Sequence, residues 1–268
     1  MTFSSPKLAP LVKYIFTRCA ADPKCKARYP ALEKTFYATL DQLHNSPLDV
    51  VTFDPVSGKG MTVKMDDDDF VAVLFLMLYD PFEASKLPQI IDRASQGDTK
   101  LLDIPYRRAL AMNYGSYEGM RASVMCTEQG SRIDLEAVQW ANAALDPAFR
   151  RMAEGSVEEI QQLCQLWDVK PADVKQSRAL KTKLPVLILA GEQDPITPLA
   201  YGELLHQSIS GSYYYAFPGT AHGVFGGGSE VHVCAESLVL QFLENSSRAP
   251  DGSCVAELGP LPFRVPSQ

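Results

Sequence analysis

The pattern of apolar and polar positions changes once along the chain, close to residue 180. Before that point apolar residues recur mainly at helical spacing, and polar turns separate the helices. After it, the short apolar run Val186–Ala190 predicts a parallel strand buried on both faces. Ser212–Phe217 predicts a second strand, and Leu199–Ile209 a helix between the two. We therefore expect a mostly helical region over residues 1–180 and an α/β region over residues 181–268.

One hairpin interrupts the helical region, because two strand-like runs, Leu48–Phe53 and Gly60–Met65, flank a turn that contains Pro, Ser and Gly. Asp22-Pro23 is interpreted as a helix break, which places Cys25 in a short loop. The expected helices are Ala9–Ala20, Tyr29–Leu43, Phe70–Tyr79, Ser85–Gln96, Lys100–Tyr114, Asp134–Leu145, Val157–Trp167 and Val231–Leu243.

Two residues that could take part in catalysis follow the two predicted strands. Asp194 lies in the loop after the first strand, and His222 lies just past the second. Thr197 is expected to cap the intervening helix, with Pro198 at its first position. Ligands and chemistry gather at the carboxyl ends of strands in open α/β sheets. An acid that orients a histidine forms two thirds of a nucleophilic triad, so we expect Asp194 and His222 to be catalytic.

The remaining polar features have simpler interpretations. Four acidic residues, 66–69, precede an apolar helix, where negative charge complements the helix macrodipole. They lack the alternation and the turn glycine of a calcium loop, so no metal site is expected. His44 at a helix end, His206 within a helix and His232 at a helix start are interpreted as surface residues.

Composition limits the partners. The formal net charge of -7 argues against binding nucleic acid or an anionic membrane. No apolar run is long enough to span a bilayer, and the first residues lack the apolar core of a signal peptide. The six cysteines form no C-x-x-C motif, which argues against zinc. On the residues alone, three disulfides and six reduced thiols remain equally open.

The segments that carry Asp194 and His222 resemble those of α/β-hydrolases, in which the chain order is nucleophile, acid, histidine. The closer resemblance is to tripeptidyl-aminopeptidase-like (TAP-like) proteins, which are related to prolyl iminopeptidase. Pro185–Pro198 is similar to the acid-bearing strand and loop of that family, and Pro218–Gly223 to its histidine loop. Weaker similarity extends from about residue 8 to residue 263, and includes pieces around each of the six cysteines.

The resemblance implies a partial α/β-hydrolase core, made of the last strands and helices of a parallel sheet, with a large helical lid. It implies a serine exopeptidase acting on a peptide or a small amide or ester, without a cofactor. Glu128 would hold the substrate's free amine, although Gln129 stands where a second acid is often found. The parent would be secreted or periplasmic. It would carry the disulfides Cys19–Cys25, Cys126–Cys164 and Cys234–Cys254.

The chain departs from the family pattern in its nucleophile. No G-x-S-x-G elbow occurs in the 268 residues. Ser116 lies in a similar stretch, but Tyr114 stands where the first glycine is required. We expect a chain whose N-terminal nucleophile half is absent and which is inactive alone. Three hypotheses remain: a truncated hydrolase, a non-catalytic protein that binds peptides or a partner, and one half of a two-chain hydrolase.

Overall fold

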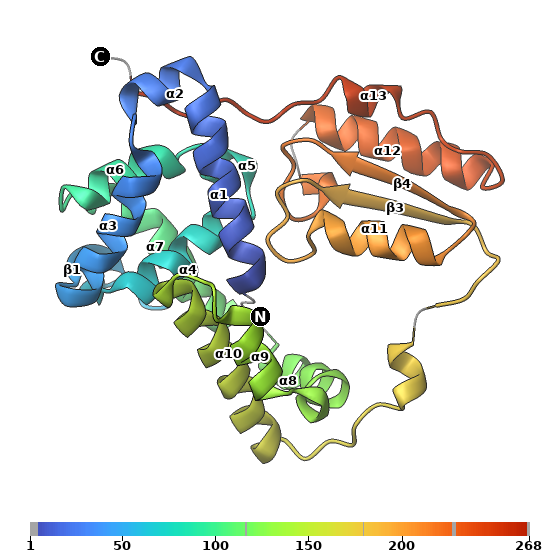
Figure 1. The fold of residues 1–268 in the computed structure, drawn as a ribbon, viewed down its shortest axis with the longest axis horizontal. Coiled ribbons are helices and arrows are strands. Elements are labelled where there is room, and N and C mark those ends of the chain that lie inside the picture. The colour runs from blue at the N-terminus through green and yellow to red at the C-terminus, as the bar shows by residue number, and fades with distance from the viewer. Residues whose placement is uncertain (1–4, 116, 179, 227–228, 267–268) are drawn as a thin grey trace. The chain divides into compact units, whose positions relative to one another are not determined.

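The structure, a computed structural model, describes residues 5–115, 117–178, 180–226 and 229–266. Its internal contacts divide the chain into two compact units. Unit 1 comprises residues 1–74 and 88–178, and unit 2 comprises residues 75–87 and 179–268. The described chain is mostly helical, and it has one small parallel sheet in unit 2 (Figure 1) and one antiparallel hairpin in unit 1.

Unit 1 is built from helices around an aromatic core. Phe36 is fully buried at its centre, and its ring lies 5.4 Å from Phe16, 6.4 Å from Phe70 and 6.1 Å from Phe149. The elements of unit 1 are α1 (Ser5–Ala21), α2 (Pro23–Arg28), α3 (Leu32–Asn45), β1 (Leu48–Phe53), β2 (Gly60–Met65), α4 (Asp67–Met77, whose last turn belongs to unit 2), α6 (Leu87–Ser95), η1 (Lys100–Leu102), α7 (Asp103–Gly115), α8 (Glu118–Glu128), η2 (Gly130–Arg132), α9 (Leu135–Asn142), α10 (Pro147–Leu166) and η3 (Val174–Ser177).

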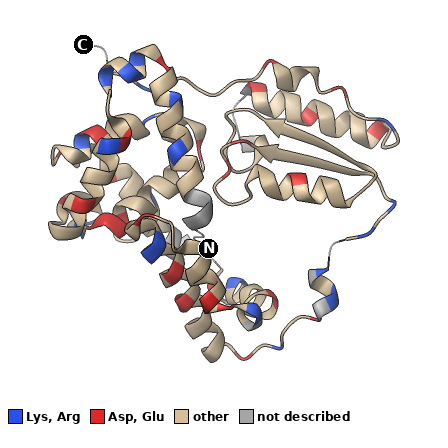
Figure 2. Ribbon diagram, in the orientation of Figure 1, with Lys and Arg blue, Asp and Glu red and all other residues tan. Residues whose placement is uncertain are grey.

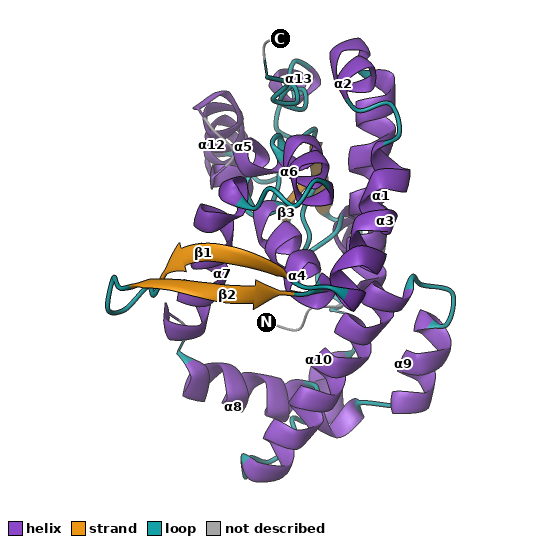
Figure 3. Ribbon diagram, turned by 90° about the vertical axis from the view of Figure 1, so that its left-hand side faces the viewer, coloured by secondary structure: helices purple, strands orange, loops and turns teal. Residues whose placement is uncertain are grey.

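The predicted hairpin is confirmed with its bounds. Figure 3 shows β1 and β2 side by side. They pair antiparallel, from Leu48 opposite Met65 to Phe53 opposite Gly60. The Asp54 carboxylate fixes the turn by accepting hydrogen bonds from the backbone N–H groups of Val56 and Ser57. Such side-chain bonds to the backbone two and three residues on are the reason that Asp favours turns.

Asp–Pro pairs start three helices, and this explains the main differences from the expected elements. In each pair the Asp side chain accepts a backbone hydrogen bond and the Pro stands at the first helical turn. Cys25 therefore lies in a helix, and the prediction of a loop there is wrong. The predicted helix over Ser85–Gln96 is found as α6, which begins two residues later and ends one residue earlier, and a separate short helix starts before it at Pro81. The pairs are Asp22-Pro23 before α2, Asp80-Pro81 before α5 (Pro81–Ala84) and Asp146-Pro147 before α10.

The acidic run 66–69 lies at the N-terminus of α4, as expected, and Figure 2 colours its backbone red. Two of its carboxylates have partners within unit 1. Asp66 accepts a hydrogen bond from the backbone N–H of Asp69, at 2.9 Å. Asp67 is buried and pairs with Arg151 and with His44. Charge pairing and capping therefore account for Asp66 and Asp67.

Unit 2 is a strand–helix–strand arrangement closed by a further helix. β3 and β4 pair parallel, with Val186 opposite Ser212 and Gly191 opposite Phe217. Figure 1 shows α11 and α12 on opposite faces of this two-stranded sheet, and Figure 2 shows that neither strand carries a charge. The elements are α5, β3 (Val186–Gly191), α11 (Leu199–Ser208), β4 (Ser212–Phe217), η4 (Val224–Gly226), α12 (Ser229–Glu244) and α13 (Ser253–Ala256).

Burial of β3 differs from the prediction. Within β3 only Ile188 and Gly191 are buried, and the other four residues are half-buried. Among the described residues β3 pairs with β4 and with no further strand. A two-stranded sheet gives its strands little lateral cover, so the expectation of a strand buried on both faces is wrong for this chain.

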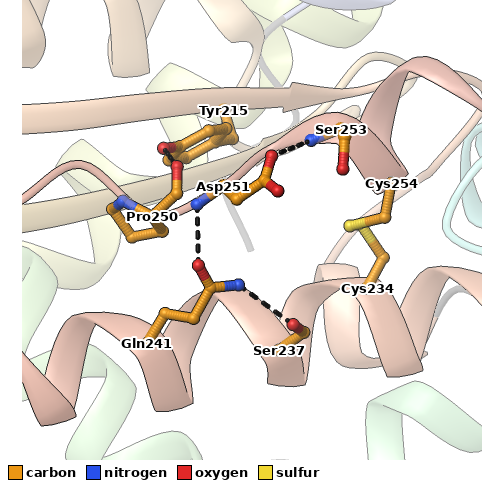
Figure 4. Close-up of a disulfide and its surroundings, with 8 residues drawn as sticks. All are labelled: Tyr215, Cys234, Ser237, Gln241, Pro250, Asp251, Ser253 and Cys254. Carbon is orange, nitrogen blue, oxygen red and sulfur yellow. Dashed lines mark hydrogen bonds between the residues drawn. A yellow bond between two sulfur atoms is a disulfide. The ribbon is translucent and has the colours of Figure 1, made fainter.

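All six cysteines form disulfides, in the pairing that the family resemblance implied: Cys19–Cys25, Cys126–Cys164 and Cys234–Cys254. Figure 4 shows the third, which joins α12 to α13. Beside it, the Gln241 amide accepts a hydrogen bond from the Asp251 N–H at 2.8 Å and donates one to Ser237 at 3.1 Å. The C-terminal segment is thus fixed to α12 by covalent and polar links.

None of the helices in the described residues combines the length and the apolar character that crossing a membrane requires.

Candidate active site

Asp194 lies three residues past β3, and its carboxylate is held by the loop that it occupies. One oxygen accepts hydrogen bonds from the backbone N–H groups of Ile196, at 2.7 Å, and Thr197, at 2.8 Å. The other accepts the Thr197 hydroxyl at 2.6 Å. The side chain is only 5% exposed. Burial and three donors from its own loop leave this carboxylate a single orientation.

Thr197 does not have the role that we expected. Pro198 is the N-cap of α11, and Thr197 lies before the helix, so the prediction of Thr197 as its cap is wrong. The Thr197 hydroxyl donates to Asp194 instead. A hydroxyl so close to a buried carboxylate donates its hydrogen bond to that carboxylate, because leaving a buried charge without a partner costs far more free energy than leaving a helix end uncapped.

His222 follows β4 in a tight turn. The turn needs Gly219, whose φ of 62° lies in the left-handed region that residues with a Cβ rarely adopt. The Nδ1 atom of His222 lies 2.9 Å and 3.0 Å from the two carboxylate oxygens of Asp194. The structure therefore joins the predicted acid and histidine, 28 residues apart, in a direct hydrogen bond.

The protonation of this pair follows from its hydrogen bonds. Burial acts to raise the pKa of Asp194, but the hydrogen bonds from Thr197, His222 and Ile196 favour the charged form and hold the pKa below its ordinary value. An ionised carboxylate only accepts hydrogen bonds, so the proton of neutral His222 stays on Nδ1. The Nε2 atom then carries a lone pair on a side chain that is 40% exposed. This arrangement suits a general base.

Backbone hydrogen bonds hold the acid loop against the histidine loop. The Gln193 N–H donates to the Thr220 carbonyl at 2.8 Å, and the Glu192 N–H donates to the Phe217 carbonyl at 3.0 Å. The Glu192 carboxylate also accepts the Gly219 N–H at 2.8 Å. These bonds set the distance between Asp194 and His222 without using either side chain.

Gly191 allows this close approach. A Cβ at this position would overlap the carbonyl oxygen of Ala221 and lie 2.6 Å from that of Thr220. Both atoms belong to backbone just before His222, so the two loops would have to separate.

We predict that Gly191→Ala lowers the free energy of unfolding by about 2–3 kcal/mol, because inserting atoms into a packed site strains the surrounding backbone. Urea unfolding would measure it. Gly155→Ala is the matched control, because a Cβ at Gly155, inside α10, would meet no atom within 4 Å. Alanine there should instead stabilise the helix, by about 0.5–1 kcal/mol. Equal effects of the two substitutions would contradict the close-approach argument.

The lowered pKa of Asp194 also predicts a pH dependence of stability. A carboxyl whose pKa is lower in the folded state stabilises the fold above its unfolded pKa, and this contribution is lost as the pH falls through the folded pKa. The difference in unfolding free energy between the wild-type chain and Asp194→Asn should therefore shrink when the pH falls below about 4. Chemical denaturation between pH 7 and pH 3 would measure it. A difference that stays constant over this range would show that the Asp194 charge is not stabilised by folding.

Tyr79 is a part of this site that sequence reasoning missed. It belongs to unit 2, and its ring lies edge-to-face against the His222 ring, with centroids 5.4 Å apart and planes at 76°. Burial, and then the negative charge of Asp194, raise the pKa of Tyr79, so its hydroxyl stays neutral. The sequence marked Tyr79 only as the end of an apolar helix, and nothing in that pattern pointed to the histidine.

The other candidate residues lie elsewhere. Glu128 is the last residue of α8 in unit 1, and its side chain is exposed. Ser116 lies outside the described residues. His44 lies in the last turn of α3, His206 forms a hydrogen bond with Ser212, and His232 forms one with the Phe225 carbonyl. Within the described ranges no group of three or more His, Cys, Asp or Glu side chains could hold a metal ion.

A buried acid bonded to a half-exposed histidine, each in a loop after a parallel strand, is the arrangement that α/β-hydrolases use. Residues 150–254 match the α/β-hydrolase family model described as TAP-like protein. The matched segment contains both Asp194 and His222, and it ends at Cys254. This part of the chain is therefore a TAP-like α/β-hydrolase region, as the sequence resemblance implied. No curated protein matches the chain.

Proposed function

We propose that this chain supplies the acid and the general base of a serine hydrolase, an exopeptidase that releases N-terminal residues or short peptides. The single observation that carries the proposal is the hydrogen bond of His222 Nδ1 to the buried Asp194 carboxylate. The match to the TAP-like family model supports a hydrolase-related function. The choice of a peptide substrate rests on the resemblance to TAP-like and prolyl-iminopeptidase-related proteins.

In this proposal each residue has a role. His222 Nε2 takes the proton of a serine hydroxyl as that oxygen attacks the scissile carbonyl, and returns it to the leaving amine. Asp194 keeps the Nδ1 tautomer and stabilises the imidazolium that forms. Thr197 and the loop N–H groups hold Asp194 in turn. A carboxylate satisfied by fixed donors needs little rearrangement when His222 becomes charged.

The serine, in this proposal, comes from polypeptide other than residues 1–268, because these residues contain no G-x-S-x-G elbow. Residues 1–268 would then be inactive alone. The incomplete cover of the sheet supports this view. β3 is half-buried, and α11 buries no residue and exposes Tyr201, Leu204 and Leu205. Further strands and helices of a larger sheet would cover such surfaces.

The same proposal assigns the regions of the chain. Residues 1–180 would form the lid and residues 181–268 the end of the core. Glu128 would bind the free amine of the substrate, which suits its exposed carboxylate. Three disulfides support an exported protein, because disulfides persist in oxidising compartments.

The test combines residues 1–268 with a polypeptide that supplies the serine nucleophile. The DNA upstream of Met1 is read in all frames, and any polypeptide with a G-x-S-x-G elbow is produced together with residues 1–268. Release of arylamine from an aminoacyl or peptidyl arylamide is then measured for the complex and for each part. We expect hydrolysis by the complex only. Hydrolysis by residues 1–268 alone that survives His222→Ala would contradict the assigned roles.

A further inference from the structure

The ring that packs on His222 comes from a distant part of the sequence. Tyr79 lies just past α4, in the segment 75–87, which begins in the last turn of α4 and belongs to unit 2. Its ring meets the imidazole edge-to-face at a centroid distance of 5.4 Å. Aromatic pairs in this geometry stabilise each other beyond the area that they bury.

Tyr79 is itself held in place. Its ring packs against Phe75, with centroids 5.5 Å apart and planes at 82°, and Phe75 is almost fully buried. One residue later, Asp80 caps α5 by accepting the Phe82 N–H. The Ser85 carbonyl, just past α5, accepts the Arg264 N–H at 2.9 Å. Tyr79 is therefore supported on both sides along the chain and reaches His222 as a fixed ring.

The hydrogen bond to Asp194 still allows the His222 ring to move in one way. It fixes the position of Nδ1, but the imidazole ring can still tilt about that bond and move Nε2. A flat side chain against the imidazole limits this tilt. It also lowers the polarity around the Nδ1–Asp194 hydrogen bond, which strengthens the bond.

We propose that Tyr79 is a positioning residue for His222: the Phe75–Tyr79 ring pair holds the imidazole in the orientation in which Nδ1 bonds Asp194 and Nε2 faces the reacting atoms. The proposal rests on the proposed function for the meaning of that orientation, but the orientation itself can be measured without activity. The proposal assigns this role to the ring of Tyr79 and not to its hydroxyl, so Tyr79→Phe should keep the orientation of His222.

The experiment follows the Nδ1 proton of His222 by NMR in the full chain labelled with ¹⁵N-histidine. His222→Gln assigns the signal. Tyr79→Phe keeps the ring, and Tyr79→Leu removes it. Tyr213→Leu is the matched control, because Tyr213 makes an edge-to-face contact with Phe242 at the same interplanar angle, 76°, and belongs to the same unit.

We expect Tyr79→Leu to speed exchange of the His222 Nδ1 proton with water by about three- to tenfold, the range that the loss of one aromatic pair gives. Tyr79→Phe and Tyr213→Leu should leave this rate within about twofold of wild type, a margin below the loss of one such pair. Should Tyr79→Leu fail to fold, Phe75→Leu tests the same point, because it removes the support of Tyr79 and should raise the rate in the same direction.

Equal exchange rates in the chain with and without the Tyr79 ring would overturn the proposal, as would a Tyr213→Leu effect equal to that of Tyr79→Leu. Failure of the proposed function has a different signature. In that case Asp194→Asn would leave the His222 signal unchanged, or His222→Ala would not affect hydrolysis in the reconstituted enzyme, whatever Tyr79 does.

Discussion

Asp194→Asn is expected to lower kcat of the reconstituted hydrolase by about 10⁴-fold, the scale of replacing the acid of a Ser-His-Asp triad by its amide. Asparagine nearly matches the shape of aspartate, so the loops should keep their positions. Its amide can, however, donate to Nδ1 and thereby place the imidazole proton on Nε2. His222 would then offer a donor where the serine proton needs an acceptor, and no negative charge would stabilise the imidazolium.

The measurement is the pH–rate profile of arylamide hydrolysis by the complex, with kcat and KM determined separately. Thr197→Val is the control for a smaller change at the same carboxylate, because it removes one hydrogen bond from Asp194 and leaves the charge in place. We expect it to lower kcat by about 10- to 150-fold, which corresponds to about 1.5–3 kcal/mol for one hydrogen bond to a charged group. If Asp194→Asn keeps kcat within a factor of about ten of wild type, Asp194 does not orient the catalytic base.

Removing the Cys126–Cys164 disulfide is expected to lower the free energy of unfolding by about 4 kcal/mol, the largest stability effect that we predict. This bond joins α8 to α10 across 38 residues of sequence. A cross-link restricts the unfolded chain, and it restricts it more when the closed loop is longer. Cys19–Cys25 closes only six residues, so its loss should cost about 2 kcal/mol.

Guanidinium unfolding of the two double alanine variants measures this difference. Both bonds lie in unit 1, so each variant controls for the other's loss of cysteine and for the packing of the unit. A larger loss for the Cys19–Cys25 pair would show that packing at the sulfur atoms, and not the length of the closed loop, decides the effect.

Local patterns were enough for much of the fold. β1, β2 and β4 have the predicted bounds, and β3 extends one residue further, to Gly191. These elements follow from alternation, apolar runs and turn residues, which act between neighbours in sequence. The Asp–Pro starts of α2, α5 and α10 were also readable in principle. Asp22-Pro23 is interpreted as a break because Pro ends a helix that precedes it, but the same Pro can stand at the first position of the helix that follows.

The sequence also placed Asp194 and His222 in the correct loops, because residues after successive parallel strands reach the same edge of the sheet. The disulfide pairs required the family resemblance, since the spacing of six cysteines permits fifteen pairings. The Thr197 hydroxyl was assigned to the helix when it belongs to the acid. Its choice of partner depends on the burial of Asp194, which composition does not reveal.

Taken by itself, the sequence determined which strands form, which loops carry the acid and the histidine, and that no G-x-S-x-G elbow lies within these 268 residues. Only the tertiary structure decided that Nδ1 of His222 meets Asp194, that Gly191 lets the two loops approach, and that Tyr79 packs on the imidazole. Tyr79 and His222 are far apart in the chain. Their contact depends on how segment 75–87 packs within unit 2, and no local pattern of residues encodes such a long-range contact.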